Sequence, residues 1–477
     1  MLIATVLMAF AISITITYYY FPRPPTYASP CDQQIGVAKI SETKLSRLQF
    51  DAVTKFLLPE PARFPNAATV APDGSVWFGE ENVPGIGHLY SNGSYVEYAW
   101  PFNYAPSVTS IWGIVLWQGR VWGSDAQGAQ LVGLNASNGD LVAVKLPNAS
   151  AFPYTITVAP DGSLWFTELF GSKLGRLSTD CKLTEYPVPN TFGGFPTQIA
   201  FVNSTYAYYI DTGNATTGVG NVLAFNPSQF SPNNINDTGR LYAPTGIAIA
   251  PDGTIWVTQH GASSIAGRDP ESQDWVLYPT STVTYQYTTL PYFVATNGSL
   301  VWFNEHYANR IAKLDTGLGL LTEFSLSNPP ASRIIGIDNA LTFAVAKDKV
   351  WFTELTANNV GYVDASYQPN FTISPPNNPV IKMKPGENTN LTFTVQGESS
   401  QPLAIQFADT ENYTAKPQKI IMTPNITEIT SLNGQPELTV NVKTDETLTP
   451  GNYTLLITVT DGMISQSAYT HLQITTN

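Results

Sequence analysis

The chain has 477 residues, and its 36 acidic side chains outnumber its 23 basic ones to give a formal net charge of −13. Nucleic acid and anionic lipid both repel such a surface, so the composition excludes a nucleic-acid-binding protein and a domain that docks on an anionic membrane. The length exceeds that of one small domain and suits a large β-domain followed by a second module.

Residues 1–22 predict an uncleaved signal anchor. Leu2 to Phe21 is a run of about 20 apolar or hydroxylic residues without a charge, which is enough to cross a bilayer as a helix. The alternative is a removed signal peptide, but the segment lacks the basic start and the small-residue cleavage site of that class. Residues 23–37 begin with a proline-rich stretch and are expected to form a stiff spacer.

Asn-x-Ser/Thr triplets follow along the whole remaining chain. An asparagine in such a triplet is glycosylated only when the chain is translocated. Together with the N-terminal span, the triplets predict a glycosylated, extracytoplasmic body at the cell surface, or a secreted one if the span is removed. The acceptor asparagines are Asn92, Asn135, Asn148, Asn203, Asn214, Asn236, Asn297, Asn370, Asn390, Asn412, Asn425 and Asn452.

The chain has two cysteines, Cys31 and Cys181. Two cysteines exclude a fold built on disulfides. Outside the cell they either pair, which ties the N-terminal segment to the third repeat described below, or stay apart. The sequence holds no Cys/His spacing typical of a metal site.

Residues 38–365 are built from a repeat of about 45 residues. The unit at residues 159–187 reads Ala-Pro-Asp-Gly, a short strand with Trp-Phe-Thr-Glu, then Lys-Leu-Gly-Arg-Leu and Leu-Thr-Glu-Tyr-Pro. Four short strands per copy, with hairpin turns such as Asp-Gly, predict an all-β fold, a seven-bladed β-propeller. The seven aromatic anchors are Trp77, Trp122, Trp165, Tyr208, Trp256, Trp302 and Trp351.

The two ends of the repeat region complement each other. Residues 44–59 match the back half of a repeat, whereas the last copy, residues 341–363, lacks an obvious fourth strand. We expect Thr54 to Leu58 to supply that strand, because ring closure leaves no sheet edge unpaired. The pattern leaves open whether one strand or two are supplied. An Asn-rich insertion in copy four, Asn226 to Asp237, is expected to be a surface loop.

A different pattern begins after the repeats. Residues 366–379, rich in proline and asparagine, predict a linker, and residues 380–477 show alternating strands separated by turns such as Lys384-Pro385-Gly386. This second region lacks tryptophan and predicts an immunoglobulin-like β-sandwich, an accessory module of about 100 residues.

The position three residues after each anchor is acidic in six of the seven copies, and its residues are Glu80, Asp125, Glu168, Asp211, Gln259, Glu305 and Glu354. Two interpretations stand. A subset, for which we select Glu305, Glu354, Glu80 and Glu168, holds Mg²⁺ or Ca²⁺ at the channel mouth. Otherwise each carboxylate meets a cation or backbone N–H within its own blade. The spacings from Glu168 to Arg176 and from Glu305 to Lys313 suit the second interpretation.

The four histidines are His88, His260, His306 and His471. His260 and His306 directly follow the recurring acidic position in adjacent repeats, so we expect them to approach each other on one rim. There they either act as a general base or metal ligand beside Glu305, or are ordinary residues of strand-end turns. His88 is expected to end a third strand, where other copies place Arg176 or Arg268. His471 is expected at the surface of the sandwich.

The repeat unit resembles that of the streptogramin B (virginiamycin B) lyases over about residues 44–364. The resemblance implies a seven-bladed propeller that opens a cyclic antibiotic by elimination at its ester, using Mg²⁺ and a histidine base. In those enzymes the base lies fourteen residues before a Trp-Phe-x-Glu glutamate and ends an Glu-Pro-His tripeptide. The matching positions here are Asn66, Tyr154, Thr245, Tyr292 (after a one-residue shift) and Ala340. None is histidine, and at the tripeptide's glutamate position Asp338 alone is acidic.

Two functions from different classes follow. The first is a membrane-anchored, glycosylated propeller that binds a small molecule or a protein partner at its face, with the sandwich as a spacer. The second is a divalent-metal-dependent carbon–oxygen lyase that acts on a cyclic ester and uses Glu305, His306 and His260. A lactonase-type propeller is weaker, since such propellers usually have six blades. No nucleophile elbow or dinucleotide-binding glycine pattern is found.

Overall fold

The structure is a computed structural model, and it describes residues 31, 34–82, 84–100, 111–189, 193–214, 218–281, 289–327, 340–378, 380–410, 419–433 and 436–476. The elements within these ranges are β-strands and two short 3₁₀ turns. Within the described ranges, no helix is long and apolar enough to span a bilayer. The predicted anchor at residues 1–22 lies outside those ranges.

The chain divides into two compact units. Unit 1 comprises residues 1–47, 56–247 and 353–360, and unit 2 comprises residues 48–55, 248–352 and 361–477. Each anchor lies in a separate antiparallel sheet, so the propeller-type repeat is confirmed. We call these sheets blades 1 to 7 in chain order.

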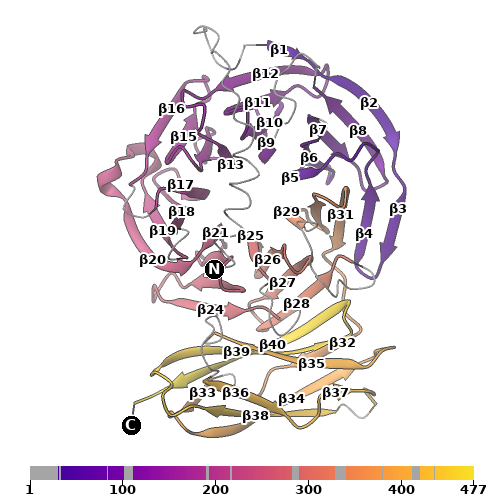
Figure 1. Ribbon diagram of the computed structural model, residues 1–477, viewed down its shortest axis with the longest axis vertical. Helices are drawn as coiled ribbons and strands as arrows, with labels where there is room; N and C mark the ends of the chain where they lie inside the picture. The colour runs from indigo at the N-terminus through magenta and orange to yellow at the C-terminus, as the bar shows by residue number, and fades with distance from the viewer. Residues whose placement is uncertain are drawn as a thin grey trace. The chain divides into compact units, whose positions relative to one another are not determined.

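Unit 1 contains blades 1 to 4 (Figure 1). Blade 1 is formed by β5 (Pro65–Val70), β6 (Val76–Glu80), β7 (Gly85–Leu89) and β8 (Ser94–Ala99), and blade 2 by β9 (Ile111–Trp117), β10 (Arg120–Asp125), β11 (Gln130–Leu134) and β12 (Asp140–Lys145). Blade 3 is formed by β13 (Pro153–Val158), β14 (Leu164–Glu168), β15 (Lys173–Leu177) and β16 (Leu183–Pro187), and blade 4 by β17 (Pro196–Asn203), β18 (Tyr206–Asn214), β19 (Val219–Phe225) and β20 (Asn236–Tyr242). The first strands β5, β9, β13 and β17 lie side by side in that order.

The repeat motif explains both the strands and their packing. In blade 3 the Asp161 carboxylate accepts a hydrogen bond from the Ser163 backbone N–H, and Gly162 has a φ of +80° that favours glycine at this turn. Trp165 and Phe166 of the following strand are fully buried between sheets. The Thr167 hydroxyl donates to the Thr197 carbonyl of blade 4 at 3.1 Å. One motif therefore builds a hairpin, a core and a link to the next blade.

The same linking position recurs at three other anchors. Ser124 Oγ donates to the Tyr154 carbonyl at 2.6 Å, Thr258 Oγ1 to the Tyr292 carbonyl at 2.8 Å, and Asn304 Nδ2 to the Ala340 carbonyl at 2.6 Å. In blade 1 the position is Gly79, where an added Cβ would lie 2.5 Å from Cβ of Ile111 in blade 2. The third residue of the motif is therefore polar in the blades where it forms a hydrogen bond to the next blade. In blade 1 it is glycine, because a side chain there would collide with Ile111.

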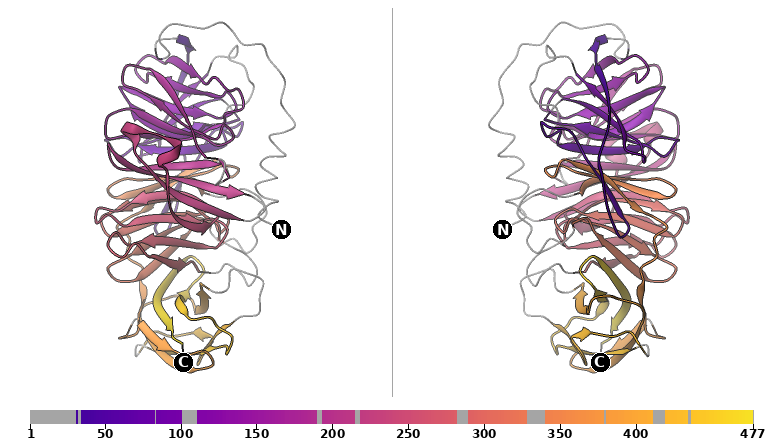
Figure 2. Two further views of the ribbon diagram at one scale, coloured as in Figure 1. Left: turned by 90° about the vertical axis from the view of Figure 1, so that its left-hand side faces the viewer. Right: turned by 90° about the vertical axis from the view of Figure 1, so that its right-hand side faces the viewer.

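Unit 1 also holds an N-terminal belt, defined as Cys31 and residues 34–44. Cys31 forms a disulfide with Cys181 of blade 3, with a Cα–Cα distance of 5.7 Å. β1 (Gln34–Val37) then pairs with β12 of blade 2, and β2 (Lys39–Lys44) pairs with β8 of blade 1. Figure 2 shows the indigo belt outside the purple sheets. The belt covers two sheet edges that would otherwise be open to pairing.

β21 (Pro244–Ile249) leads into unit 2, where blade 5 continues with β22 (Ile255–Gln259), β23 (Ser264–Arg268) and β24 (Trp275–Pro279). Blade 6 is formed by β25 (Pro291–Asn297), β26 (Leu300–Glu305), β27 (Arg310–Asp315) and β28 (Leu320–Ser325), and blade 7 by β29 (Ala340–Val345), β30 (Lys349–Glu354) and β31 (Asn359–Asp364). Blade 7 is completed by the N-terminal strands β4 (Val53–Leu57) and β3 (Arg47–Phe50) in the order β31–β4–β3. The prediction that residues near Thr54 supply the missing strand is confirmed, and two strands are added rather than one.

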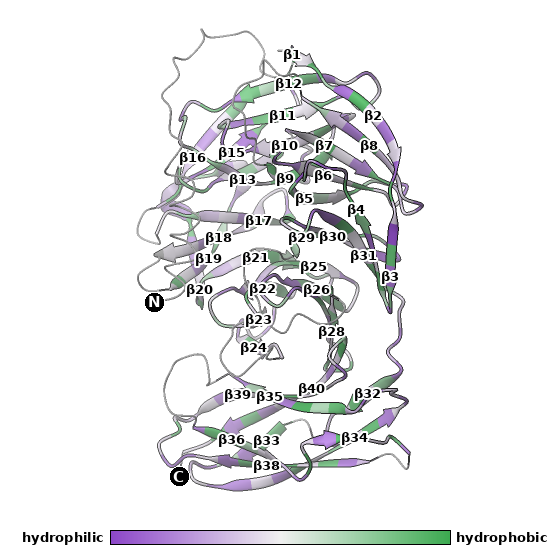
Figure 3. Ribbon diagram, turned by 45° about the vertical axis from the view of Figure 1, so that its right-hand side comes forward, coloured by the Kyte–Doolittle hydropathy of each residue, from purple (hydrophilic) through white to green (hydrophobic). Residues whose placement is uncertain are grey.

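The C-terminal region forms two sheets that share a core with blade 6. One contains β32 (Phe371–Ser374), β34 (Asn388–Gly397), β38 (Glu437–Thr444) and β36 (Ile420–Pro424). The other contains β33 (Val380–Met383), β35 (Leu403–Asp409), β37 (Glu428–Ile429), β39 (Gly451–Thr460) and β40 (Ile464–Ile474). Figure 3 shows hydrophobic stretches along β35, β39 and β40.

Strand β40 joins this module to the propeller repeat. Its first half pairs with β28 of blade 6, from Leu320 opposite Ala468 to Phe324 opposite Ile464, and its other edge pairs with β39. One continuous sheet therefore runs from blade 6 into the C-terminal module. β32 also lies inside the segment expected to be a linker, so an ordered strand occupies part of residues 366–379. The insertion in blade 4 forms two exposed 3₁₀ turns, η3 (Pro227–Gln229) and η4 (Pro232–Asn234).

Candidate functional site

All seven residues of the recurring acidic position are buried, at 0–3% exposure. They lie on the second strand of each blade, most of them at its C-terminal end. A buried carboxylate must be paired, bonded or protonated, because burial penalises its charge. The surroundings of each one therefore decide between the metal interpretation and the local one.

In blade 1 Glu80 belongs to a closed network. The Tyr95 hydroxyl donates to Glu80, and Arg63 forms an ion pair with Glu97 at 2.8 Å. Burial raises the pKa of Glu80 to about 8, against the lowering effect of the Tyr95 hydrogen bond. Glu80 is therefore protonated at neutral pH and bonded within its own sheet.

In blade 3 Glu168 lies opposite Lys173, the first residue of the next strand. Lys173 Nζ forms an ion pair with Glu185 at 2.6 Å, and burial together with the Glu185 charge raises the pKa of Glu168 to about 8. The expected pairing of Glu168 with Arg176 is wrong. Arg176 lies opposite Trp165 and forms an ion pair with Asp161 at 2.8 Å, because the tight turn after Glu168 sets a closer register.

Blade 6 repeats the arrangement of blade 3. Arg310 lies opposite Glu305, with Nη1 3.9 Å from Glu305 Oε2 and 3.7 Å from Glu323 Oε2. Burial and the neighbouring Glu323 raise the pKa of Glu305 well above its usual value. The expected pairing of Glu305 with Lys313 is also wrong, since Lys313 lies opposite Trp302 with Nζ 5.6 Å from that ring.

The remaining recurring positions also have partners in their own blades. Asp125 accepts a hydrogen bond from Gln130 at 2.8 Å, and Asp211 accepts backbone N–H groups that include Gly194 at 2.9 Å. Gln259 donates to Ser264 at 2.8 Å, and Asn359 donates to Glu354 at 3.4 Å. Each of these residues therefore has a hydrogen-bond partner in its own blade, as the second interpretation of the recurring position expects.

A shared Mg²⁺ or Ca²⁺ site does not fit these carboxylates. Glu80, Glu168 and Glu305 are enclosed in separate networks, and two of them carry a raised pKa near 8 that disfavours the ionised form a hard cation needs. Among the described residues, no three His, Cys, Asp or Glu side chains gather closely enough to hold a metal ion. We derive no step through a metal.

His260 and His306 lie together in unit 2. Their Nε2 atoms are 2.8 Å apart, and the rings are stacked with an interplanar angle of 7°. Both are 5% exposed, so they are more buried than rim residues. Burial lowers the pKa of His260 to about 4 and that of His306 well below its usual value, so both are neutral at pH 7. One imidazole donates and the other accepts.

The other two histidines serve other parts of the fold. His88 stacks on Trp77 at 3.8 Å and lies 2.6 Å from Ser75 Oγ, and burial lowers its pKa to about 4. His88 corresponds in register to Arg176, as expected, whereas its counterpart in blade 5 is Gly267 rather than Arg268. His471 is half-buried, with Nδ1 3.2 Å from Thr454 Oγ1, so it is less exposed than predicted.

The positions that correspond to the lyase base lie on first strands and have packing roles in the structure. Tyr154 contacts the Trp112 ring at 5.1 Å, and Asn66 donates to Glu81 at 3.0 Å. Tyr292 packs edge-on against both imidazoles of the pair, 5.5 Å from His260 and 5.3 Å from His306. The histidine pair therefore lies beside one of these positions, with each imidazole in the turn that follows a second strand. Asp338 lies outside the described residues.

Sequence reasoning missed the second glutamate of each buried pair. Glu97, Glu185 and Glu323 lie on the fourth strands of blades 1, 3 and 6, opposite Gly87, Gly175 and Ala312. A signal was present, since Leu-Thr-Glu recurs in the fourth strands of blades 3 and 6. The small residue opposite makes room for the inward carboxylate.

Comparison with known proteins agrees with this architecture. The model of the virginiamycin B lyase family matches residues 105–223. The virginiamycin B lyase of Nocardia farcinica is 27% identical over 155 residues, which are 31% of this chain and 49% of that protein. That of Bordetella parapertussis is 46% identical over 46 residues, or 10% and 15% of the two chains. The chain thus spans at most about half the length of the curated relatives it matches.

Solved lyases share the fold. The virginiamycin B lyase of Staphylococcus aureus superposes with a TM-score of 0.53 and 21% identity, covering 68% of this chain and 99% of that one. A streptogramin B lyase structure gives a TM-score of 0.54 and 21% identity, with 65% and 97% covered. The repeat region is therefore a streptogramin B lyase-like propeller.

Proposed function

We propose that this chain is a ligand-binding propeller that has the lyase scaffold without the lyase reaction. In this account it is anchored by residues 1–22, glycosylated and extracytoplasmic, its seven blades close into a ring, and its C-terminal sheets form an immunoglobulin-like accessory module. The module acts as a rigid extension of blade 6, because β28 and β40 are paired. The partner is a small molecule or a protein at the propeller face.

The main support for this proposal is that no histidine occupies the positions that match the lyase base. A solved Staphylococcus aureus lyase with quinupristin is a catalytically inactive variant in which one histidine is replaced by alanine. Here the matching first-strand positions hold other residues, and the chain's four histidines pack elsewhere or bond each other. A base buried at 5% exposure and hydrogen-bonded to a second imidazole is poorly placed to take a substrate proton.

The exposure of the glycosylation triplets supports the extracytoplasmic part. Ten acceptor asparagines have described side chains, and each is exposed or half-buried; Asn412 and the side chain of Asn214 lie outside the described residues. By contrast, none of the buried asparagines Asn66, Asn221, Asn304, Asn309 and Asn358 starts a triplet. In Asn92, Asn135 and Asn203 the carboxamide oxygen accepts the backbone N–H two residues further on, so the bond uses Oδ1 and not Nδ2, the atom that would carry a glycan.

Expression of the full chain in its native host tests this proposal. Membrane fractionation should recover the protein in the membrane pellet, and chemical deglycosylation should lower its mass. Thermal unfolding with quinupristin then measures binding. A rise in Tm without chemical change supports a binding protein. An unglycosylated protein in the soluble fraction would overturn the extracytoplasmic part, and no rise with any cyclic ester would remove that ligand class.

A second function, an ester lyase that uses the histidine pair, is favoured by one observation. Tyr292 occupies a position where the lyases are expected to have their base. Its ring contacts the imidazoles of His260 and His306, with centroids 5.5 and 5.3 Å away, so both histidines are neighbours of that position. Both imidazoles are neutral at pH 7, as a general base must be. Quinupristin opening by the wild type and not by His306→Ala would favour this second function over the first.

A further inference from the structure

A basic side chain lies opposite the anchor tryptophan in three blades. His88 is opposite Trp77, Arg176 is opposite Trp165, and Lys313 is opposite Trp302. His88 stacks on its indole at 3.8 Å, and Lys313 Nζ lies 5.6 Å from its own. Arg176 and Lys313 carry a charge at neutral pH, whereas burial lowers the pKa of His88 to about 4 and leaves it a neutral imidazole.

In blades 1 and 3 the residue opposite the tryptophan also lies near the aspartate of the Asp-Gly turn. Arg176 forms an ion pair with Asp161 at 2.8 Å, and the charge of Asp73 acts on His88. The turn aspartate, the indole and the residue opposite it therefore form one set in both blades, and in blade 3 Arg176 neutralises the acid from the neighbouring strand.

Blade 5 keeps the acid and the indole but lacks the base. Asp252 begins the Asp-Gly turn before Trp256, and the residue opposite Trp256 is Gly267. Arg268, one place further, falls on the other side of the strand and donates Nε–H to the Gln273 carbonyl at 3.1 Å. Among the described residues of unit 2, no ion pair is formed to Asp252 or to Asp269 beside it.

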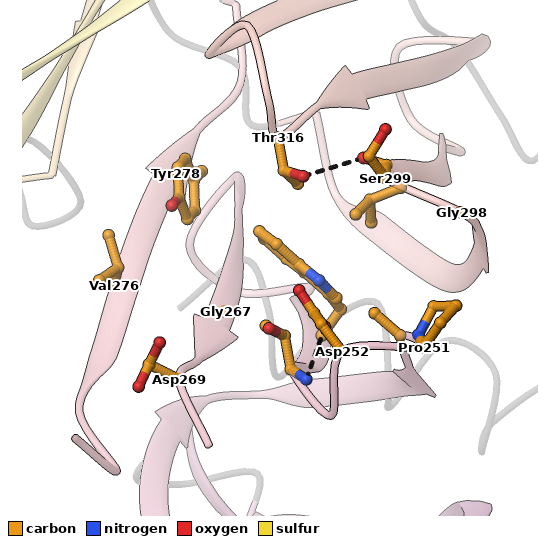
Figure 4. A pocket seen from close by; sticks show the side chains of 13 residues that line it. Pro251, Asp252, Gly267, Asp269, Val276, Tyr278, Gly298, Ser299 and Thr316 are labelled. Carbon is orange, nitrogen blue, oxygen red and sulfur yellow. Dashed lines mark hydrogen bonds between the residues drawn. The ribbon is translucent and has the colours of Figure 1, made fainter. Parts of the chain in front are cut away.

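A cavity of about 500 Å³ lies at this place, between blades 5 and 6 (Figure 4). Asp252 of the Asp-Gly turn and Asp269, which follows β23, line it, and Tyr278 and Val276 line it from β24. Ser299 and Thr316 line it from blade 6, where the Thr316 hydroxyl donates to the Ser299 carbonyl at 3.0 Å, and the buried Trp256 also lines it. The volume is within the range of small-molecule sites.

Blade 2 shows that a missing base does not by itself leave such a space. Gly133 lies opposite Trp122, yet Trp117 of the same sheet packs edge-on against Trp122 at 5.6 Å. Trp117 Nε1 also donates to the Gly162 carbonyl of blade 3. In blade 5 the corresponding space is open and carries two exposed carboxylates.

We propose that the blade 5 cavity binds a small organic cation, with a guanidinium or alkylammonium group between Asp252 and Asp269 and its apolar part against Tyr278. The exogenous cation takes the role that Arg176 has in blade 3. Two unneutralised carboxylates and an aromatic wall match such a group through charge-assisted hydrogen bonds and cation–π attraction. The site lies at the start of β22, whereas His260 follows its end, so this inference does not depend on the proposed function.

Calorimetric titration of the purified full chain with L-arginine amide tests the proposal. L-citrulline amide is the control ligand, since it replaces the guanidinium by an uncharged urea of the same shape. The expected result is saturable binding of arginine amide, weakened by added salt, with citrulline amide binding about tenfold more weakly or not at all. Equal binding of the two ligands, or none of either at millimolar concentration, would overturn the proposal.

Variants then locate the site. Asp252→Asn and Asp269→Asn should each weaken arginine amide binding about tenfold, whereas Glu271→Gln, which removes an exposed charge outside the cavity lining, should leave it unchanged. Gly267→Arg installs the blade 3 arrangement and should abolish binding while the cooperative thermal transition remains. If Gly267→Arg fails to fold, the two asparagine variants still decide. Unaltered affinity in both of them would contradict the assignment.

Discussion

The Nε2 atoms of His260 and His306 lie 2.8 Å apart, so the two buried imidazoles share a hydrogen bond that holds one proton between these nitrogens. A second proton would set two N–H groups against each other in a site that already excludes water. This relationship makes the pair a structural element that depends on neutrality, and it yields a clear dependence of stability on pH.

We predict that acid weakens the fold through this pair. The folded pKa of His260 is about 4, below the unfolded value of 6.5, so the unfolded state binds protons first. The stability contribution is complete above pH 6.5 and is lost as the pH falls toward 4, by up to about 3 kcal/mol for a fully buried histidine. Thermal unfolding from pH 7 to pH 4 should show a shallower decline for His306→Gln than for the wild type, and parallel curves would contradict the prediction.

Glu80 should have the opposite effect on the pH dependence of stability. Its folded pKa of about 8 lies above the unfolded 4.5, so the folded state retains a proton that the unfolded state has lost. Stability therefore declines as the pH rises from 4.5 to 8. Glu80→Gln keeps an acceptor for the Tyr95 hydroxyl and removes the titration. Its unfolding free energy, measured in urea between pH 5 and pH 8, should be flatter than that of the wild type. A variant that loses as much stability as the wild type over this range would show that Glu80 is ionised when folded.

The belt disulfide should contribute substantially to stability. Cys31 and Cys181 are 150 residues apart, and cross-links over long loops restrict the unfolded chain most. The double substitution Cys31→Ser, Cys181→Ser should lower the unfolding free energy by about 2–5 kcal/mol. Reductant should lower the Tm of the wild type and leave that of the double variant unchanged. Equal Tm values for the oxidised wild type and the double variant would contradict this prediction and would mean that the pairing of β1 and β2 is enough to fix the belt.

The inter-blade hydrogen bond of Thr167 should be measurable. Thr167→Val preserves shape but removes the donor to the Thr197 carbonyl, which lies 3.1 Å from Oγ1, and leaves a buried acceptor with one bond fewer. The expected loss is about 1–2 kcal/mol. Thr184→Val, on the outer strand of the same blade, is the matched control and should change stability little. Equal effects at both sites would argue against a special role for the linking position.

Sequence patterns were enough for the repeat and its strands because their signals are local. The Asp-Gly turn before Trp165 and the buried Trp-Phe pair act within one hairpin, so the second strand of each blade falls where the anchors predict it. The supply of β4 to the last repeat could also be predicted, since Thr54 lies in a recognisable back half of a unit.

The partners of the buried carboxylates could not be predicted as well, because register depends on turn length. Glu168 was expected beside Arg176, but a four-residue turn places Lys173 opposite it. A register error of one place likewise put Arg268 where Gly267 lies. The pairing of β40 with β28 had no local signal, since it joins strands more than a hundred residues apart.

The most direct test of the central claim, a lyase scaffold without lyase chemistry, is incubation of the purified full chain with quinupristin and Mg²⁺, followed by liquid chromatography with mass detection. Elimination at the ester gives a linear isomer of unchanged mass, and hydrolysis adds one water, so the two reactions are distinguished. A streptogramin B lyase serves as the positive control. The cyclic compound should be recovered intact. A linear isomer that forms with the wild type and disappears with His306→Ala would contradict it.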